Sequence, residues 1–244
     1  GASQRSASFT LCPLRCAHSS SWSRRISYSP SSRIQPRSRP INSVRICNPI
    51  FGDGEAVIPA FNVSGVLPPF DTSLGPTSPA GTSPYSVAIS DVARTLGSTP
   101  DRLEILKGLL SYREALIASG IEDGFQWLDG SFVEDVERLR GRSPNDIDVV
   151  TIAHRPAAHR TKAAWDTFVS GNPALFDPVL AKSSYQCDAY FIDLDSHPKN
   201  VVNRTRYWFG LFSHQRATSL WKGMLQVPIR SDDATVPAML RIGR

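Results

Sequence analysis

Two aspartates that could bind a metal ion stand two residues apart in the stretch SPNDIDVV. Asp146 and Asp148 belong to a run rich in β-branched residues, residues 146–152, which predicts a strand after the turn-forming residues 143–145. Residues two apart on a strand project from the same face, so both carboxylates should point toward one site. Hard cations such as Mg²⁺ prefer carboxylate and phosphate oxygens. The pair is therefore a candidate Mg²⁺ site.

A glycine and a serine, Gly130 and Ser131, follow another predicted strand, residues 125–128. Glycine lets the backbone approach a ligand closely, and free amide groups at the start of a following helix suit a polyphosphate. Ser131 could instead be only the helix N-cap, and the two roles are compatible. Asp129, just before this turn, is expected to be a local cap or turn acid rather than a metal ligand.

A third acid, Asp188, lies in the predicted strand QCDAYFI, residues 186–192, among mostly apolar neighbours. Two metal ions that serve the attacking and leaving oxygens of a displacement usually need more than two carboxylates. Asp188 is therefore the best third metal ligand, whereas Asp193 and Asp195 read as solvated loop residues. The histidines and cysteines have no zinc-site spacing, and no zinc is predicted.

These motifs resemble the signature of the DNA polymerase β-like nucleotidyltransferase superfamily, which has Gly-Ser, then Asp-hydrophobic-Asp, then an aspartate on a later strand. The chain is more closely similar to a little-characterised bacterial family described as nucleotidyltransferases. The shared segments are IPAFN-x-x-G-x-LPP, LDGSF, PNDIDVV, the strand with Asp188 and the late RYWFGLF and WKGMLQV. The resemblance covers residues 58–229. The fourteen residues between Ser131 and Asp146 are slightly more than usual, and a turn at residues 140–142 would absorb the difference.

The resemblance implies a reaction and a role for each motif. Gly130 and Ser131 would hold the triphosphate of an NTP such as ATP, while Asp146 and Asp148 would bind Mg²⁺ or Mn²⁺. Asp188 would complete the metal site and help to activate the acceptor hydroxyl. The reaction would transfer a nucleoside monophosphate to a protein, a small molecule or an RNA end, and release pyrophosphate. The alternative is a catalytically inactive protein that keeps the fold for binding, such as an antitoxin-like partner.

Two features near the C-terminus add candidate nucleotide contacts. Lys222 precedes a predicted strand and is a candidate phosphate ligand. In Arg204-Thr-Arg-Tyr-Trp-Phe209, Tyr207 or Trp208 could stack on a base while Arg206 contacts phosphate. Core packing is favoured for Trp208, because it continues an apolar stripe at helical spacing.

The elements that must position these residues alternate between helix and strand. Residues 100–119 form a long helix with Leu103, Leu106, Leu110 and Ile117 toward the core and Arg102 elsewhere. The other predicted helices are residues 88–96, 157–169, 173–181 and 198–212, and the last predicted strand is 224–229. The pattern indicates an α+β (α/β) fold with a mixed sheet flanked by helices, and the resemblance implies a polymerase β-like core.

The chain divides into three parts on composition. Residues 1–57 are rich in Arg and Ser and should not fold alone. They could be a disordered tail, a transit peptide or upstream sequence translated from a misplaced start codon, and the last interpretation is favoured. Residues 58–99 are expected to form an extended arm and a short helix. Residues 100–244 form the predicted nucleotidyltransferase-like domain.

Charge and hydropathy narrow the choice of partners. Eight of the 27 Lys and Arg residues lie in residues 1–52, which leaves 19 basic residues against 22 acidic ones in the body. Duplex nucleic acid is therefore an unlikely partner, although a local basic patch stays open. No apolar run is long enough to cross a membrane, so a cytoplasmic protein is expected. The acceptor could be a protein encoded nearby.

Overall fold

A five-stranded mixed sheet forms the centre of the described structure. The computed structural model describes residues 58–238; the predictions for residues 1–57 lie outside them. The strand order is β1-β5-β2-β3-β4. The strands are β1 (Tyr85–Ser86), β2 (Gly124–Asp129), β3 (Ile147–Ala153), β4 (Cys187–Asp193) and β5 (Leu225–Pro228). β2 is antiparallel to β3 and β5, whereas the β3–β4 and β1–β5 pairs are parallel. The predicted mixed sheet is therefore confirmed.

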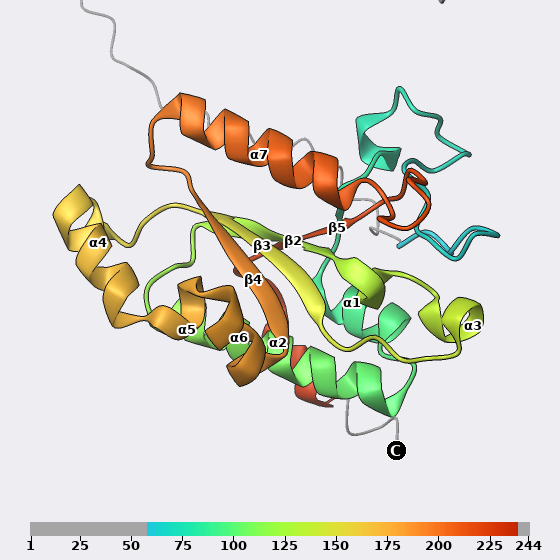
Figure 1. Ribbon diagram of the computed structural model, residues 1–244, viewed down its shortest axis with the longest axis horizontal. Helices are drawn as coiled ribbons and strands as arrows, with labels where there is room; N and C mark the ends of the chain where they lie inside the picture. Colours follow the sequence, from blue (N-terminus) through green and yellow to red (C-terminus); the bar gives the residue numbers. More distant parts are fainter. Residues whose placement is uncertain (1–57, 239–244) are drawn as a thin grey trace, which may run out of the picture. The chain divides into compact units, whose positions relative to one another are not determined.

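Helices cover both faces of this sheet, which confirms the α+β class. The α-helices are α1 (Ile89–Leu96), α2 (Pro100–Ala118), α3 (Val136–Arg140), α4 (Lys162–Gly171), α5 (Pro173–Phe176), α6 (Pro178–Tyr185) and α7 (Pro198–Phe212). In Figure 1, α7 runs across one face of the sheet, and α2, α5 and α6 lie on the other. No helix within residues 58–238 is long and apolar enough to cross a membrane.

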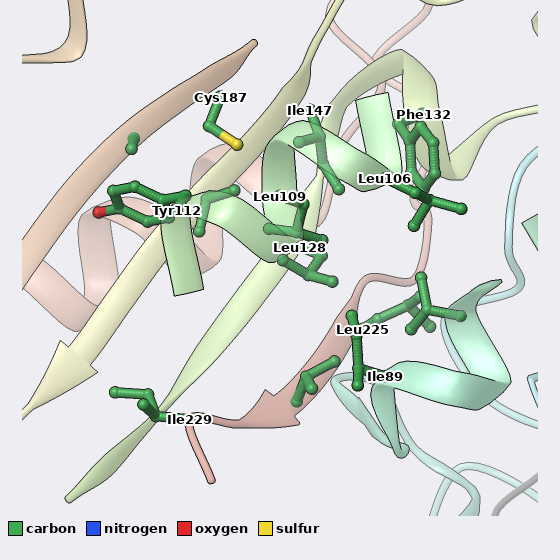
Figure 2. Close-up of a cluster of buried hydrophobic side chains, with 14 of the residues drawn as sticks. Ile89, Leu106, Leu109, Tyr112, Leu128, Phe132, Ile147, Cys187, Leu225 and Ile229 are labelled. Carbon is green, nitrogen blue, oxygen red and sulfur yellow. The ribbon is translucent and has the colours of Figure 1, made fainter. Parts of the chain in front are cut away.

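The larger core lies between the sheet and helices α1, α2 and α6. Alternate strand residues, such as Ile147 and Val149 of β3 and Cys187 of β4, are fully buried there against Leu106 and Leu109 of α2. Figure 2 shows how these side chains converge from the helices and from neighbouring strands. The period of two along β3 and β4 thus sends one set of side chains into this core and the other set to the α7 face.

A smaller apolar cluster lies on the α7 face. It is formed by Trp127, Val150, Ile152, Ile192, Phe212 and Met224. Trp208 packs on Tyr190 and on Phe212, with ring centroids 4.3 Å and 5.5 Å apart. The expected core role of the apolar stripe on α7 is therefore confirmed. The predicted aspartates project from the same face of the sheet, so their exposure to solvent depends on which part of this face α7 does not cover.

Helix α2 buries two arginines, one of which the sequence pattern places outside the core. Arg102 is 2% exposed and Arg113 is fully buried. The Arg102 guanidinium donates to the carbonyls of Phe132 and Glu134 and pairs with Glu137 at 2.7 Å. Placing Arg102 away from the core was wrong, because these long-range acceptors satisfy a buried charge that helical periodicity cannot reveal.

The segment before α2 joins the same core. Val66 and Leu67 are 0% and 1% exposed, and Val66 forms a bridge with Glu134. The two residues of β1 pair with β5 and were not predicted as a strand. The extended arm is therefore fixed to the sheet at several points, beside the predicted short helix α1.

Candidate functional site

Three aspartates lie side by side on three neighbouring strands. The register pairs Asp129 of β2 with Asp148 of β3, and Asp148 with Asp188 of β4. Paired residues project from the same face, so the three side chains form a row on the α7 face, with about 4.8 Å between strands. We call Asp129, Asp148 and Asp188 the acid row. The predicted strand began at Asp146, whereas β3 begins at Ile147, so Asp146 lies immediately before the strand.

A pocket of about 270 Å³ opens over the acid row. It brings together six of the predicted site residues, namely Gly130, Ser131, Asp146, Asp148, Asp188 and Lys222. The other candidate nucleotide contacts, Arg206, Tyr207 and Trp208, do not line this pocket. Residues that were not predicted to belong to the site also line it, namely Asp129, Glu134, Arg140, Lys182, Leu211, Phe212, His214, Gln215 and Arg216. The C-terminal end of α7 and the loop after it form one wall, which places basic and acidic groups in one cavity.

The turn at Gly130 passes directly beside the acid row. Gly130 has φ +82°, and a Cβ atom there would overlap Asp148 Oδ2. The chain then forms a single 3-10 turn, Gly130–Val133, where a helix was expected to begin, and the short helix α3 starts only at Val136. Within residues 58–238 the Ser131 hydroxyl makes no hydrogen bond, and the cap position belongs to Asp129. The turn therefore offers a close backbone approach, but fewer free helical amides than predicted.

The predicted longer connection between this turn and β3 is present. Helix α3 ends at Arg140, and Gly141 follows in the left-handed region with φ +59°. The extra length is thus taken up by a short helix and a tight turn at residues 140–142.

Asp129 is the residue whose role the sequence analysis missed. It makes no side-chain cap hydrogen bond and is only 4% exposed. Lys222 Nζ lies 2.9 Å from Asp129 Oδ1, yet this contact lacks hydrogen-bond alignment, and the oxygen has no other partner among the described residues. Burial raises the pKa of Asp129 to about 7, against the lowering effect of Lys222. The available signal was its place at the end of a strand, immediately before Gly130.

Lys222 is held inside the pocket by two acids. Its side chain is 3% exposed and lies 3.1 Å from Glu134 Oε1 as well as 2.9 Å from Asp129. Glu134 also accepts hydrogen bonds from Arg140 and Gln215, each at 2.9 Å. Lys222 therefore lies beside the acid row, as a phosphate ligand would, but its charge is shared with buried carboxylates.

The electrostatics of the row are those of crowded carboxylates. Burial, together with the charges of Asp146 and Asp188, raises the pKa of Asp148 to about 6, against the lowering effect of Arg216 and Lys222. Asp146 forms an ion pair with Lys182 of α6. Lys182 and Lys222 thus reduce the repulsion between the neighbouring carboxylates of the pocket.

The side chains do not form a ready metal centre in this arrangement. Across residues 58–238, no three acidic, histidine or cysteine side chains are grouped closely enough to hold a metal ion. The two ion pairs account for this physically, because Lys182 and Lys222 draw Asp146 and Asp129 toward themselves. The oxygen donors that a hard cation prefers are nevertheless gathered in one pocket.

Asp193 and Asp195, interpreted from sequence as solvated, instead organise the far end of β4. Asp193 pairs with Arg155 at 2.7 Å, and the two side chains are only 14% and 11% exposed. Asp195 accepts from the Arg155 amide and contacts His154 at 3.0 Å. Arg155 is therefore occupied by structural contacts and lies outside the pocket.

Fold and site together define a mixed α+β protein with an acidic pocket at the ends of three neighbouring strands. Residues 59–228 match the model of a family of unknown function, DUF6932, and the chain belongs to this family. No curated protein and no solved structure matches the chain.

Proposed function

We propose that the chain is a nucleotidyltransferase with a polymerase β-like core, which transfers a nucleoside monophosphate from an NTP to an acceptor hydroxyl. The observation that carries the proposal is the acid row beside the Gly130 turn, where a side chain would overlap Asp148. A turn without a Cβ suits a bound phosphate chain, and neighbouring carboxylates suit the metal ions that phosphoryl transfer uses.

The residues present fit a divalent cation by their chemistry. Asp146, Asp148 and Asp188 supply only oxygen donors, and Asp129 Oδ1 is a buried acceptor without a hydrogen bond. These acids would repel a triphosphate, so a cation is needed to join the two. Asp146, Asp148 and Asp188 would hold Mg²⁺ or Mn²⁺, which supplies positive charge near the developing negative charge of the reaction.

The proposed reaction balances with the groups of this pocket. The acceptor oxygen forms a bond to the α-phosphorus, and the bond from that phosphorus to the bridging oxygen breaks. Pyrophosphate leaves with the bonding electrons, and the hydroxyl proton passes to a carboxylate. Asp188 suits the proton-accepting role because it lies at the end of the acid row farthest from the Gly130 turn.

Other side chains of the pocket would bind and orient the substrates. Arg216 is exposed and lies at the pocket, where its charge attracts phosphate. Lys222 would fix Asp129 from inside the pocket, and the missing side chain of Gly130 lets the turn lie directly against Asp148. Positioning and charge provide most of the acceleration in this type of chemistry.

A second candidate function is binding without catalysis. The ion pair of Lys182 with Asp146 and the absence of a closed metal group in the described residues favour it. An interaction protein that keeps the fold would neither bind an NTP nor respond to Mg²⁺.

Thermal unfolding with each NTP and Mg²⁺ separates the two functions. Ligand at 100 times its dissociation constant stabilises the folded state by about 2.7 kcal/mol, which raises the melting temperature by several degrees. We expect the rise in the wild type, a loss in Asp148→Asn, and no loss in Asp166→Asn, an exposed acid on α4. No shift with any NTP in the wild type would refute the enzyme and favour the interaction protein.

A further inference from the structure

A second pocket, of about 410 Å³, lies beside β4 at the edge of the sheet. Its walls come from both faces of the strand and include five aromatic residues, Trp165, Phe176, Tyr190, Phe191 and Trp208. The polar lining residues are Ser196, Asn200, Arg204 and Asp193, and Asp193 is paired with Arg155. Tyr190 and Trp208 form one pair, with centroids 4.3 Å apart, and Phe176 and Phe191 form another at 5.3 Å. Aromatic walls on opposite sides of a cavity suit a flat ring.

This edge pocket is adjacent to the acid row. Asp188 lines the first pocket and Tyr190 lines the second, and the two residues project from the same face of β4 about 7 Å apart. The Gly130 turn follows Asp129, at the opposite end of the row. A ring in the edge pocket would therefore approach the acids from the side away from the phosphate turn, which is where an acceptor must enter.

In one segment of the chain that lines both pockets, residues 196–231, the charged side chains are all positive. Residues 196–231 contain no Asp or Glu. The cations of this segment are Lys199, Arg204, Arg206, Arg216, Lys222 and Arg230. Those on α7 are all exposed, and Arg204 lines the edge pocket while Arg216 lines the first. Because the body after residue 52 is net acidic, this basic segment is a local feature that fits a polyanion.

We propose that the acceptor is a single-stranded nucleic acid whose terminal base occupies the edge pocket and whose phosphates follow the cations of α7. Stacking of bases on aromatic rings beside a basic track is how single strands are bound without sequence preference. Tyr207, which is 61% exposed, stands next to Arg206 and offers a second ring. A paired base cannot enter the pocket, so the preference is for unpaired strands. The transfer step rests on the proposed function, whereas the binding does not.

Fluorescence anisotropy of the full chain with a labelled ten-nucleotide RNA tests the basic track. The test variant is Arg204→Gln with Arg206→Gln. The matched control is Arg94→Gln with Lys107→Gln, which removes equal charge from exposed residues of α1 and α2. We expect a roughly ten-fold weaker affinity and a shallower salt dependence for the test variant alone. Equal loss in both variants, or equal affinity for duplex RNA, would overturn the proposal.

The arginines of residues 1–57 are present in every variant and can contribute RNA affinity of their own. Binding of a base in the edge pocket therefore needs a separate measurement. Photocrosslinking of an RNA with a terminal 5-bromouracil should label peptides of β4 and α7, and Tyr190→Leu should remove that label. Labels confined to residues 1–57, or displacement of the RNA by an acidic tyrosine-containing peptide at lower concentration, would overturn the proposal.

The two proposals fail in different ways. Asp148→Asn should keep RNA binding and its crosslink, because this acid belongs to the phosphate side of the site. RNA binding in a chain that binds no NTP would refute the transferase and support the nucleic-acid surface. NTP binding without an RNA crosslink at β4 would refute the nucleic-acid surface and leave the transferase.

Discussion

Asp148 Oδ2 occupies the space that a side chain at position 130 would fill. Gly130 is therefore constrained twice, by its φ of +82° and by contact with a carboxylate of the neighbouring strand. The contact fixes the separation between the turn and the acid row, which the proposed transfer requires.

Replacement of Gly130 by alanine should damage both folding and the site. The Cβ atom would meet Asp148, and the left-handed backbone adds strain, so we expect a loss of roughly 1–3 kcal/mol in unfolding free energy. NTP binding should fall by more than ten-fold in the folded fraction, as measured by calorimetric titration.

Gly141→Ala is the matched control for that substitution. Gly141 also has a positive φ, +59°, but no atom lies within 4 Å of its missing Cβ. Its cost should be limited to backbone strain, about 1–2 kcal/mol, with unchanged NTP affinity. Equal NTP affinity in the Gly130 and Gly141 variants would show that the Gly130 turn does not contact the nucleotide.

Lys222→Met should destabilise the protein strongly. It leaves Asp129 and Glu134 buried without their shared cation, and breaking a buried ion pair costs about 3 kcal/mol or more. Denaturant unfolding measures the loss. Adding Asp129→Asn to this variant should recover part of it, and a double variant no more stable than Lys222→Met would contradict the proposed pairing.

Lys182→Gln should strengthen metal binding. The Lys182 side chain is 53% exposed and pairs with Asp146, which is 19% exposed, so removal of the ammonium group frees a carboxylate for a cation. The gain should be modest, roughly two- to five-fold in Mn²⁺ affinity, because exposed ion pairs contribute at most about 1 kcal/mol. Titration with Mn²⁺ alone measures it, with Lys162→Gln as control; unchanged or weaker affinity would argue against Asp146 as a ligand.

Glu137 should contribute to the pH dependence of stability. Its hydrogen bonds from Arg102 lower the pKa of its carboxyl group from the usual 4.5. A lowered folded-state pKa means that the stabilisation is present above pH 4.5 and is lost as pH falls through the folded-state pKa.

The test compares the wild type with Glu137→Gln by denaturant unfolding between pH 7 and pH 3. The wild type should be the more stable at pH 7, and the difference should shrink below pH 4.5. A difference that stays constant with pH would show that ionisation of Glu137 is not the source.

Local patterns were enough to predict much of the fold and six of the fifteen residues that line the pocket. The β-branched run around Asp148, the mostly apolar run around Asp188 and the apolar stripe of α7 each specify one element, and these elements are present. Arg102 was misplaced because the carbonyls of Phe132 and Glu134, to which it donates, lie thirty or more residues away in the chain. β1 was missed because two residues carry no periodicity and the strand exists only through its pairing with β5.

The same limit explains what was missed at the site. Asp129 beside a glycine looks like an ordinary turn residue, and only the pairing of β2 with β3 places it next to Asp148. The pairing of Lys182 with Asp146 likewise depends on how α6 packs. Residue types and spacing predicted that Asp146, Asp148 and Asp188 lie together, whereas register and packing determine which charges neutralise each other.

Transfer of an α-labelled nucleotide is the most direct test of the central proposal. The purified full chain is incubated with each α-³²P-labelled NTP, Mg²⁺ and short RNA or the protein itself as acceptor. The account predicts acceptor-bound label and stoichiometric pyrophosphate, both lost in Asp146→Ala with Asp148→Ala and retained in Asp166→Asn. Label that persists in the double variant, or neither label nor NTP binding in the wild type, would contradict it.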